Sequence, residues 1–82
     1  MKYTIELARK AIKDLKAIPK GDRARIIERI EAMEDDLSGD VKRLTNHTPE
    51  YRMRSGNWRV LFEVEGQRII IYRVLHRKEA YR

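Results

Sequence analysis

The sequence predicts an α+β domain in which a helical hairpin packs on one face of a four-stranded, mainly antiparallel sheet. One short alternating segment is followed by two segments with apolar residues at helical spacing, and then by three strand-like segments separated by glycine-containing turns. The expected order is therefore β-α-α-β-β-β, with the helices segregated on one side of the sheet. A chain of 82 residues is long enough for one domain over 1–82 but not for a second core.

The first half of the chain contains the predicted helices. Residues 3–7 alternate with a period of two and indicate a short strand. Over 8–18 the apolar residues recur every three or four positions, and Pro19 ends this helical segment. Asp22 is the expected N-cap of a second helix, which residues 38–40 are expected to end because they contain a glycine.

The second half contains the predicted meander. Residues 41–49 are expected to form a loop in which Leu44 is a lone apolar anchor. Strand-like segments follow at 50–54, 58–64 and 68–76, and the glycine between each pair favours a hairpin turn. These segments predict a three-stranded antiparallel meander, to which the N-terminal strand adds a fourth strand.

Positive charge in the final third of the chain is carried mainly by arginine. The formal net charge is +6. Residues 50–82 contain seven Arg and one Lys, with four Asp or Glu residues. Residues 1–49 contain five Arg and six Lys, with nine Asp or Glu residues. A guanidinium presents a planar fork of donors that suits phosphate oxygens better than an ammonium does. The bias favours recognition of a polyanion over its alternative, an ordinary solvated basic face.

Side-chain alternation groups these arginines. In the first two strands of the meander Arg52, Arg54 and Arg59 fall on one face, opposite to the apolar residues. The last strand is expected to bring His76 and Arg77 to the edge where these arginines converge. The sequence thus predicts a cationic sheet face with titratable side chains beside it.

Several kinds of chemistry are not expected from this composition. The chain has no Cys, its two His are far apart, and it has no glycine-rich phosphate loop and no Ser-His-Asp set. We therefore expect neither a metal nor a cofactor. No stretch approaches the roughly 18 apolar residues of a membrane span, so we expect a soluble, cytoplasmic protein without membrane contact.

The remaining Arg, Lys, His and Tyr suit the cleavage of RNA by its own 2′-hydroxyl. In that reaction the protein supplies a base, an acid and stabilisation of a five-coordinate phosphate, but no nucleophile. His76 and Tyr81 are the candidates for proton transfer. The structural alternatives are that Tyr81 packs over the sheet and that His76 bonds a backbone carbonyl at the strand end.

The whole pattern resembles the RelE/ParE toxin superfamily of bacterial and archaeal toxin–antitoxin systems. The resemblance rests on a basic-x-basic strand before a Gly turn, an Arg one residue past the turn aromatic and a terminal His-Arg-x-x-x-Tyr, here Arg52-Met53-Arg54, Trp58-Arg59 and His76-Arg77 with Tyr81. It implies a toxin that binds the ribosomal decoding site and cuts mRNA there without a metal. It also implies a cognate antitoxin, a separate and acidic protein that holds the toxin inactive.

The resemblance further implies a role for each matching residue. Arg52 and Arg54 match strand residues that contact RNA and the cleaved phosphate, and Arg59 matches the transition-state arginine. Arg77 matches a further phosphate or leaving-group contact, and Tyr81 matches a tyrosine that stacks on a base or acts as the general base. The chain departs from the family in carrying Arg in place of Lys in the basic strand. The charge is kept, but a guanidinium hardly gives up a proton, so this strand is not expected to transfer one.

Three more cations are expected to add RNA contacts: Arg73, Lys78 and Arg82. Two other functions stay open at this point. A ParE-like toxin shares the fold but poisons DNA gyrase and generally lacks the basic and tyrosine set, and a non-catalytic nucleic-acid-binding module would bind without turnover.

Overall fold

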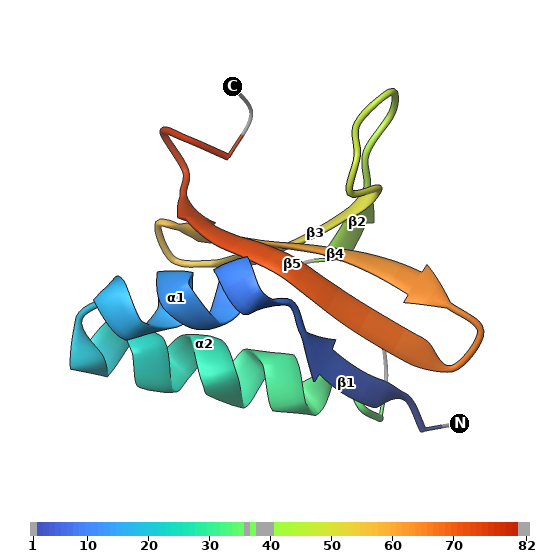
Figure 1. Cartoon of the computed structure of the whole chain (residues 1–82), viewed down its shortest axis with the longest axis horizontal. Coiled ribbons are helices and arrows are strands. Elements are labelled where there is room, and N and C mark those ends of the chain that lie inside the picture. Colours follow the sequence, from blue (N-terminus) through green and yellow to red (C-terminus); the bar gives the residue numbers. More distant parts are fainter. Residues whose placement is uncertain (1, 36, 38–40, 81–82) are drawn as a thin grey trace.

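A computed structural model describes residues 2–35, 37 and 41–80 and shows two helices on one face of a mixed sheet (Figure 1). In chain order the elements are β1 (Thr4–Leu7), α1 (Arg9–Ala17), α2 (Lys20–Ala32), β2 (Val41–Arg43), β3 (Tyr51–Ser55), β4 (Trp58–Glu65) and β5 (Arg68–His76). The sheet order is β1-β5-β4-β3-β2, with β1 parallel to β5 and the other pairs antiparallel. The predicted class and the helical hairpin are confirmed, but the sheet has five strands instead of four.

The additional strand is β2, which lies where a loop was predicted. It pairs antiparallel with β3, and beyond it the Leu44 N–H donates to the Glu50 carbonyl at 2.6 Å. Three residues are too few to show a period of two, so the sequence carried no signal for this strand. Its backbone groups pair with an edge of β3 that would otherwise be left open. Residues 38–40, expected to end the second helix, lie outside the described residues.

The second helix begins three residues earlier than predicted. Pro19 occupies the N-cap position with φ −53° and ψ 143°, and Ile18 before it is extended, as steric contact with a proline ring favours. Asp22 is therefore not the cap but lies in the first turn of α2, where a carboxylate is favoured by the helix dipole. Its side chain is left to accept a hydrogen bond from Trp58 Nε1 at 3.2 Å.

The hydrophobic core fills the space between the helices and the sheet. Among its fully buried side chains are Ile26 of α2, Met53 of β3, Val60 and Phe62 of β4, and Ile71 of β5. Trp58 packs against this cluster while half-buried. Neither of the described helices is long and apolar enough to cross a membrane.

The Asp14 side chain links α1 to β5 through hydrogen bonds. Its carboxylate accepts hydrogen bonds from Arg73 Nε at 2.8 Å and Nη2 at 3.1 Å, and from the Val74 N–H at 2.9 Å. Because β1 ends at Leu7, opposite Ile71, no paired strand satisfies the Val74 N–H on that side. The bond to Asp14 also raises the pKa of Arg73 above the usual arginine value.

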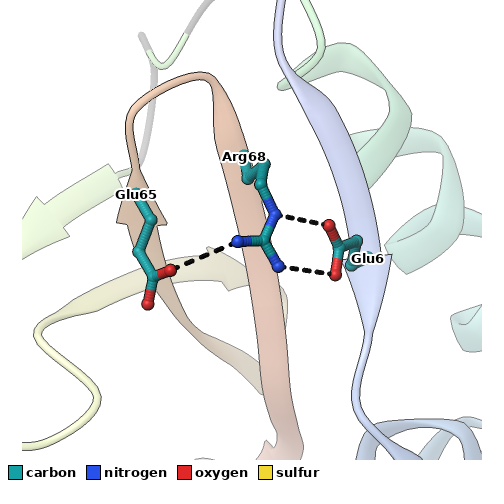
Figure 2. A network of polar contacts seen from close by, with 3 residues as sticks. All are labelled: Glu6, Glu65 and Arg68. Carbon is teal, nitrogen blue, oxygen red and sulfur yellow. Dashed lines mark hydrogen bonds and ion pairs between the residues drawn. The ribbon is translucent and has the colours of Figure 1, made fainter.

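Arg68 holds the short parallel strand β1 against β5 (Figure 2). It donates to both carboxylate oxygens of Glu6, at 2.6 and 3.0 Å, and to Glu65 Oε1 at 3.4 Å. The hydrogen bond from Arg68 lowers the pKa of Glu6 below its ordinary value of 4.5. Because these side chains are about half exposed, solvent screens the pair and its contribution to stability is modest.

Replacing Asp14 with Ala is expected to lower the free energy of unfolding by about 2–3 kcal/mol, because Arg73 and the Val74 N–H both lose their partner. Asp14→Asn keeps an acceptor without the charge and should cost roughly half as much. Urea denaturation measures both, with the exposed Asp35→Asn as the control. A loss within about 0.5 kcal/mol for Asp14→Ala, the range of ordinary surface substitutions, would contradict this role.

Replacing Glu6 with Gln is expected to reduce stability at neutral pH but not in acid. Because the pKa of Glu6 is lower in the folded chain than in the unfolded chain, its stabilisation is full above the unfolded value and is lost as the pH falls through the folded value. Thermal unfolding across this range should show wild type and Glu6→Gln converging well below pH 4.5. The control is Glu31→Gln on the exposed surface of α2, and a gap that stays constant with pH would argue against the linkage.

Candidate functional site

Four cationic side chains lie on the sheet face turned away from the helices. Arg54 of β3 stands directly opposite Arg59 of β4, and Lys42 of β2 stands opposite Arg52 of β3. Adjacent residues in these strands are buried in the core on the other face. The structure therefore brings Arg52, Arg54 and Arg59 together, as the alternation predicted, and adds Lys42.

These cations surround a shallow hollow of about 370 Å³, here called the basic hollow, which is lined by Lys42, Leu44, Arg52, Arg54 and Arg59. No carboxylate is among these lining residues, and like charges on directly opposed strand residues destabilise a sheet. Such a local conflict between charges is typical of a functional site. The arrangement suits an anion, and guanidinium groups suit one with several oxygens, such as phosphate.

Arg59 is held in place by the turn between β3 and β4. Its Nη1 donates to the Gly56 and Trp58 carbonyls, both at 3.0 Å, and Gly56 has a positive φ of 59° that few other residues adopt. The Arg77 N–H donates to the carbonyl of Asn57 at 2.8 Å. The Arg59 side chain and the Arg77 backbone are thus both bonded to carbonyls of the same turn, although Arg77 is not among the residues that line the basic hollow.

His76 lies on the opposite face, contrary to expectation. It pairs with Trp58 in the register of β4 and β5, and the two rings meet edge to face with centroids 5.4 Å apart. Its Nδ1 accepts a hydrogen bond from the Lys78 N–H at 3.3 Å. Leu75, the preceding residue, is the one opposite Arg59. The imidazole is therefore on the helix side of the sheet and not in the basic hollow.

A β-bulge explains this placement. Leu61 pairs with Arg73 while the next residue of β4, Phe62, pairs with Ile71, so Tyr72 is an extra residue in β5. One extra residue in a strand moves every later side chain of that strand to the opposite face of the sheet. Before the bulge Ile71 faces the helices, and after it Val74 and His76 do. The β-branched and aromatic residues of β5 form a continuous series up to Tyr72, so the sequence contains no signal that would predict a bulge at this residue.

The remaining predicted RNA contacts differ in their surroundings. Arg73 is engaged by Asp14, which gives it a structural role. Lys78 is exposed in the turn that follows β5. Tyr81 and Arg82 lie outside the described residues, so their roles stay predictions.

The segment after β5 runs on the side of the sheet away from the helices (Figure 1). Ala80 in this segment is 4% exposed, and Leu61, which alternates away from the helices, is 3% exposed. Neither residue belongs to the core cluster between the helices and the sheet. Their burial is consistent with the C-terminal turn covering part of the same face that carries the basic hollow.

A second hollow of about 510 Å³ lies between α2 and the β3–β4 turn, where Asp22, Arg25, Glu28, Arg29, Gly56 and Trp58 are among its lining residues. It contains charges of both signs. Asp22 accepts from Trp58 Nε1 and from Arg25 Nη2 at 2.9 Å, and these two bonds lower its pKa. Although this hollow is larger, its lining includes the carboxylates of Asp22 and Glu28, so the basic hollow is the better site for an anion.

Comparison with known proteins identifies the family. Residues 5–81 match the family described as the ParE toxin of the type II toxin–antitoxin system parDE. The chain belongs to the RelE/ParE toxin superfamily. Among its members, toxin RelE3 of Methanocaldococcus jannaschii is 42% identical over 79 residues, which cover 90% of each protein.

Solved structures of the RelE/ParE superfamily share the fold. A chain of the RelB–RelE antitoxin–toxin complex from Methanococcus jannaschii superposes with a TM-score of 0.78 at 39% identity, covering 93% of this chain and 94% of that one. A chain of the chromosomal ParDE system from P. aeruginosa gives a TM-score of 0.74 at 19% identity, covering 92% and 96%. Because both branches have this fold, the fold alone does not distinguish their activities.

Replacing Arg54 with Gln is expected to weaken binding of a short single-stranded RNA and to reduce its salt dependence. Loss of one phosphate contact should make the plot of log affinity against log salt shallower by about 0.7. Fluorescence anisotropy at several salt concentrations measures this slope, with Lys10→Gln on exposed α1 as the control. Equal slopes for Arg54→Gln and wild type would mean that RNA phosphates do not bind in the basic hollow.

Proposed function

We propose that the protein is a RelE-like toxin that cleaves mRNA at the ribosomal decoding site and so inhibits translation in the cytoplasm. The observation that carries this proposal is the basic hollow, in which three arginines and a lysine converge without a lining carboxylate. In this reaction the 2′-hydroxyl of the RNA attacks the adjacent phosphate and leaves a cyclic phosphate. The protein then needs to supply only charge stabilisation and proton transfer.

The arginines would stabilise the extra negative charge of the five-coordinate phosphate. Arg59 is the best placed, because its guanidinium is already fixed by two carbonyls and retains further donors for phosphate oxygens. Arg52 and Arg54 would contact the RNA backbone from β3. Arg77, whose backbone N–H donates to Asn57 in the turn that precedes β4, would contact the phosphate or the leaving group. Removal of one such donor typically costs a factor of about 10²–10³ in rate.

Tyr81 is proposed as the general base or as a platform on which an RNA base stacks. Nearby guanidinium groups favour the phenolate form of a tyrosine, which is the form that can accept a proton. This role rests on the match between Tyr81 and the family's tyrosine in the terminal His-Arg-x-x-x-Tyr pattern. His76 is not part of the proposed catalytic set, because its ring contacts Trp58 on the other face of the sheet.

The proposed partner is a separate, acidic antitoxin that covers the basic face. The similarity to a chain of a RelB–RelE antitoxin–toxin complex supports a partner of this kind. A ParE-like activity against DNA gyrase is the rival function, which the description of the matching family favours. The presence of Arg52, Arg59, Arg77 and Tyr81 together favours RNA cleavage instead, since the gyrase-directed members generally lack this set.

Primer extension on translated mRNA tests the proposed function. Wild type should produce codon-specific cleavage, and Arg59→Ala and Tyr81→Phe should each lose it by a factor of about 10² or more. Lys13→Gln, a loss of charge on exposed α1, is the matched control and should cleave normally.

The rivals give different results in the same experiment. Intact mRNA together with stabilised gyrase–DNA adducts would establish the ParE-like function. Salt-dependent RNA binding without turnover would establish a non-catalytic module.

A further inference from the structure

Lys42 is the site residue that the sequence did not reveal. It lies on β2, stands opposite Arg52 in the register of β2 and β3, and lines the basic hollow with an exposed side chain. The other three cations that line the basic hollow are arginines. A guanidinium keeps its proton under almost all conditions, whereas an ammonium can give one up.

RNA cleavage by the 2′-hydroxyl requires a proton for the leaving 5′-oxygen. The described arginines in the basic hollow are poor donors of a proton, and His76 is on the other face of the sheet. Tyr81 is proposed for the opposite task of accepting the 2′-hydroxyl proton. Among the described residues that line the basic hollow, Lys42 is the side chain whose chemistry fits the second proton transfer.

We propose that Lys42 is the general acid that protonates the leaving 5′-oxygen, an inference that rests on the proposed RNA cleavage. The P–O2′ bond forms as the P–O5′ bond breaks. The proton of the 2′-hydroxyl passes to the general base, and an Nζ proton of Lys42 passes to the 5′-oxygen. The general base then releases its proton to water and the lysine amine takes one up, so each group regains its charge and nothing is oxidised or reduced.

The neighbours of Lys42 keep it available for this role. Arg52 faces it from β3, and Arg54 and Arg59 share the basic hollow with it. The carboxylate of Glu50 accepts from the adjacent Arg43 at 3.0 and 3.2 Å.

Among the described residues, the carboxylate of Glu63 is also engaged near Glu50. Glu63 accepts a hydrogen bond from the Glu50 backbone N–H at 2.9 Å. The strand pairing and the bond between the Leu44 N–H and the Glu50 carbonyl fix the backbone that carries Lys42.

A leaving group that needs no proton provides the test. Single-turnover cleavage would be measured on ribosome-bound mRNA with either the natural linkage or a sulfur in place of the bridging 5′-oxygen, because a thiolate leaves without protonation. Lys42→Ala and Lys42→Arg should both be slowed on the natural linkage, by a factor of about 10²–10⁴, and should recover to near the wild-type rate on the sulfur linkage. Arg59→Ala, which removes charge stabilisation, should remain slow on both.

Lys42→Arg is the decisive variant because it keeps the positive charge while removing the transferable proton. If it cleaves the natural linkage at the wild-type rate, or if it is slowed equally on both linkages, Lys42 is not the proton donor. Failure of the wild type to cleave either linkage would overturn the proposed function and this inference with it. Thermal unfolding of each variant confirms that this exposed position on an edge strand tolerates the change.

Discussion

The pairing of β3 with β4 in a single register is the constraint on which the rest of the structure depends. Met53 and Val60 are opposed partners in this register, and both are buried beneath the helices. Because successive side chains in a strand point to opposite faces, burying this pair directs Arg54 and Arg59 to the other face. A slip of one residue would expose the core and bury the cations, so folding and assembly of the basic hollow cannot be separated.

Much of this arrangement could be predicted from the sequence because it follows from local patterns. The helical spacing of apolar residues located both helices, and the alternation around Gly56 located β3, β4 and the arginine face. The start of α2 was misplaced because Pro19 and Asp22 both suit a helix start, and sequence alone does not rank them. Element boundaries are set by such small differences, whereas the identity of an element depends on many residues.

The features that the sequence did not predict depend on contacts between distant segments. β2 forms only because β3 offers an edge, and its three residues carry no pattern of their own. The extra residue Tyr72 is accommodated where Asp14, on a different element, satisfies the Val74 N–H beside it. These two events added Lys42 to the candidate site and removed His76 from it.

The position of β2 at the end of the sheet has a consequence for solubility. An edge strand exposes unpaired backbone groups to which a second copy of the chain could add, and proteins commonly block this with short strands and charged side chains. β2 has three residues, of which Lys42 and Arg43 are both exposed and cationic. The charge that we propose for catalysis therefore also discourages edge-to-edge aggregation, so replacing Lys42 with an apolar residue would remove both effects at once.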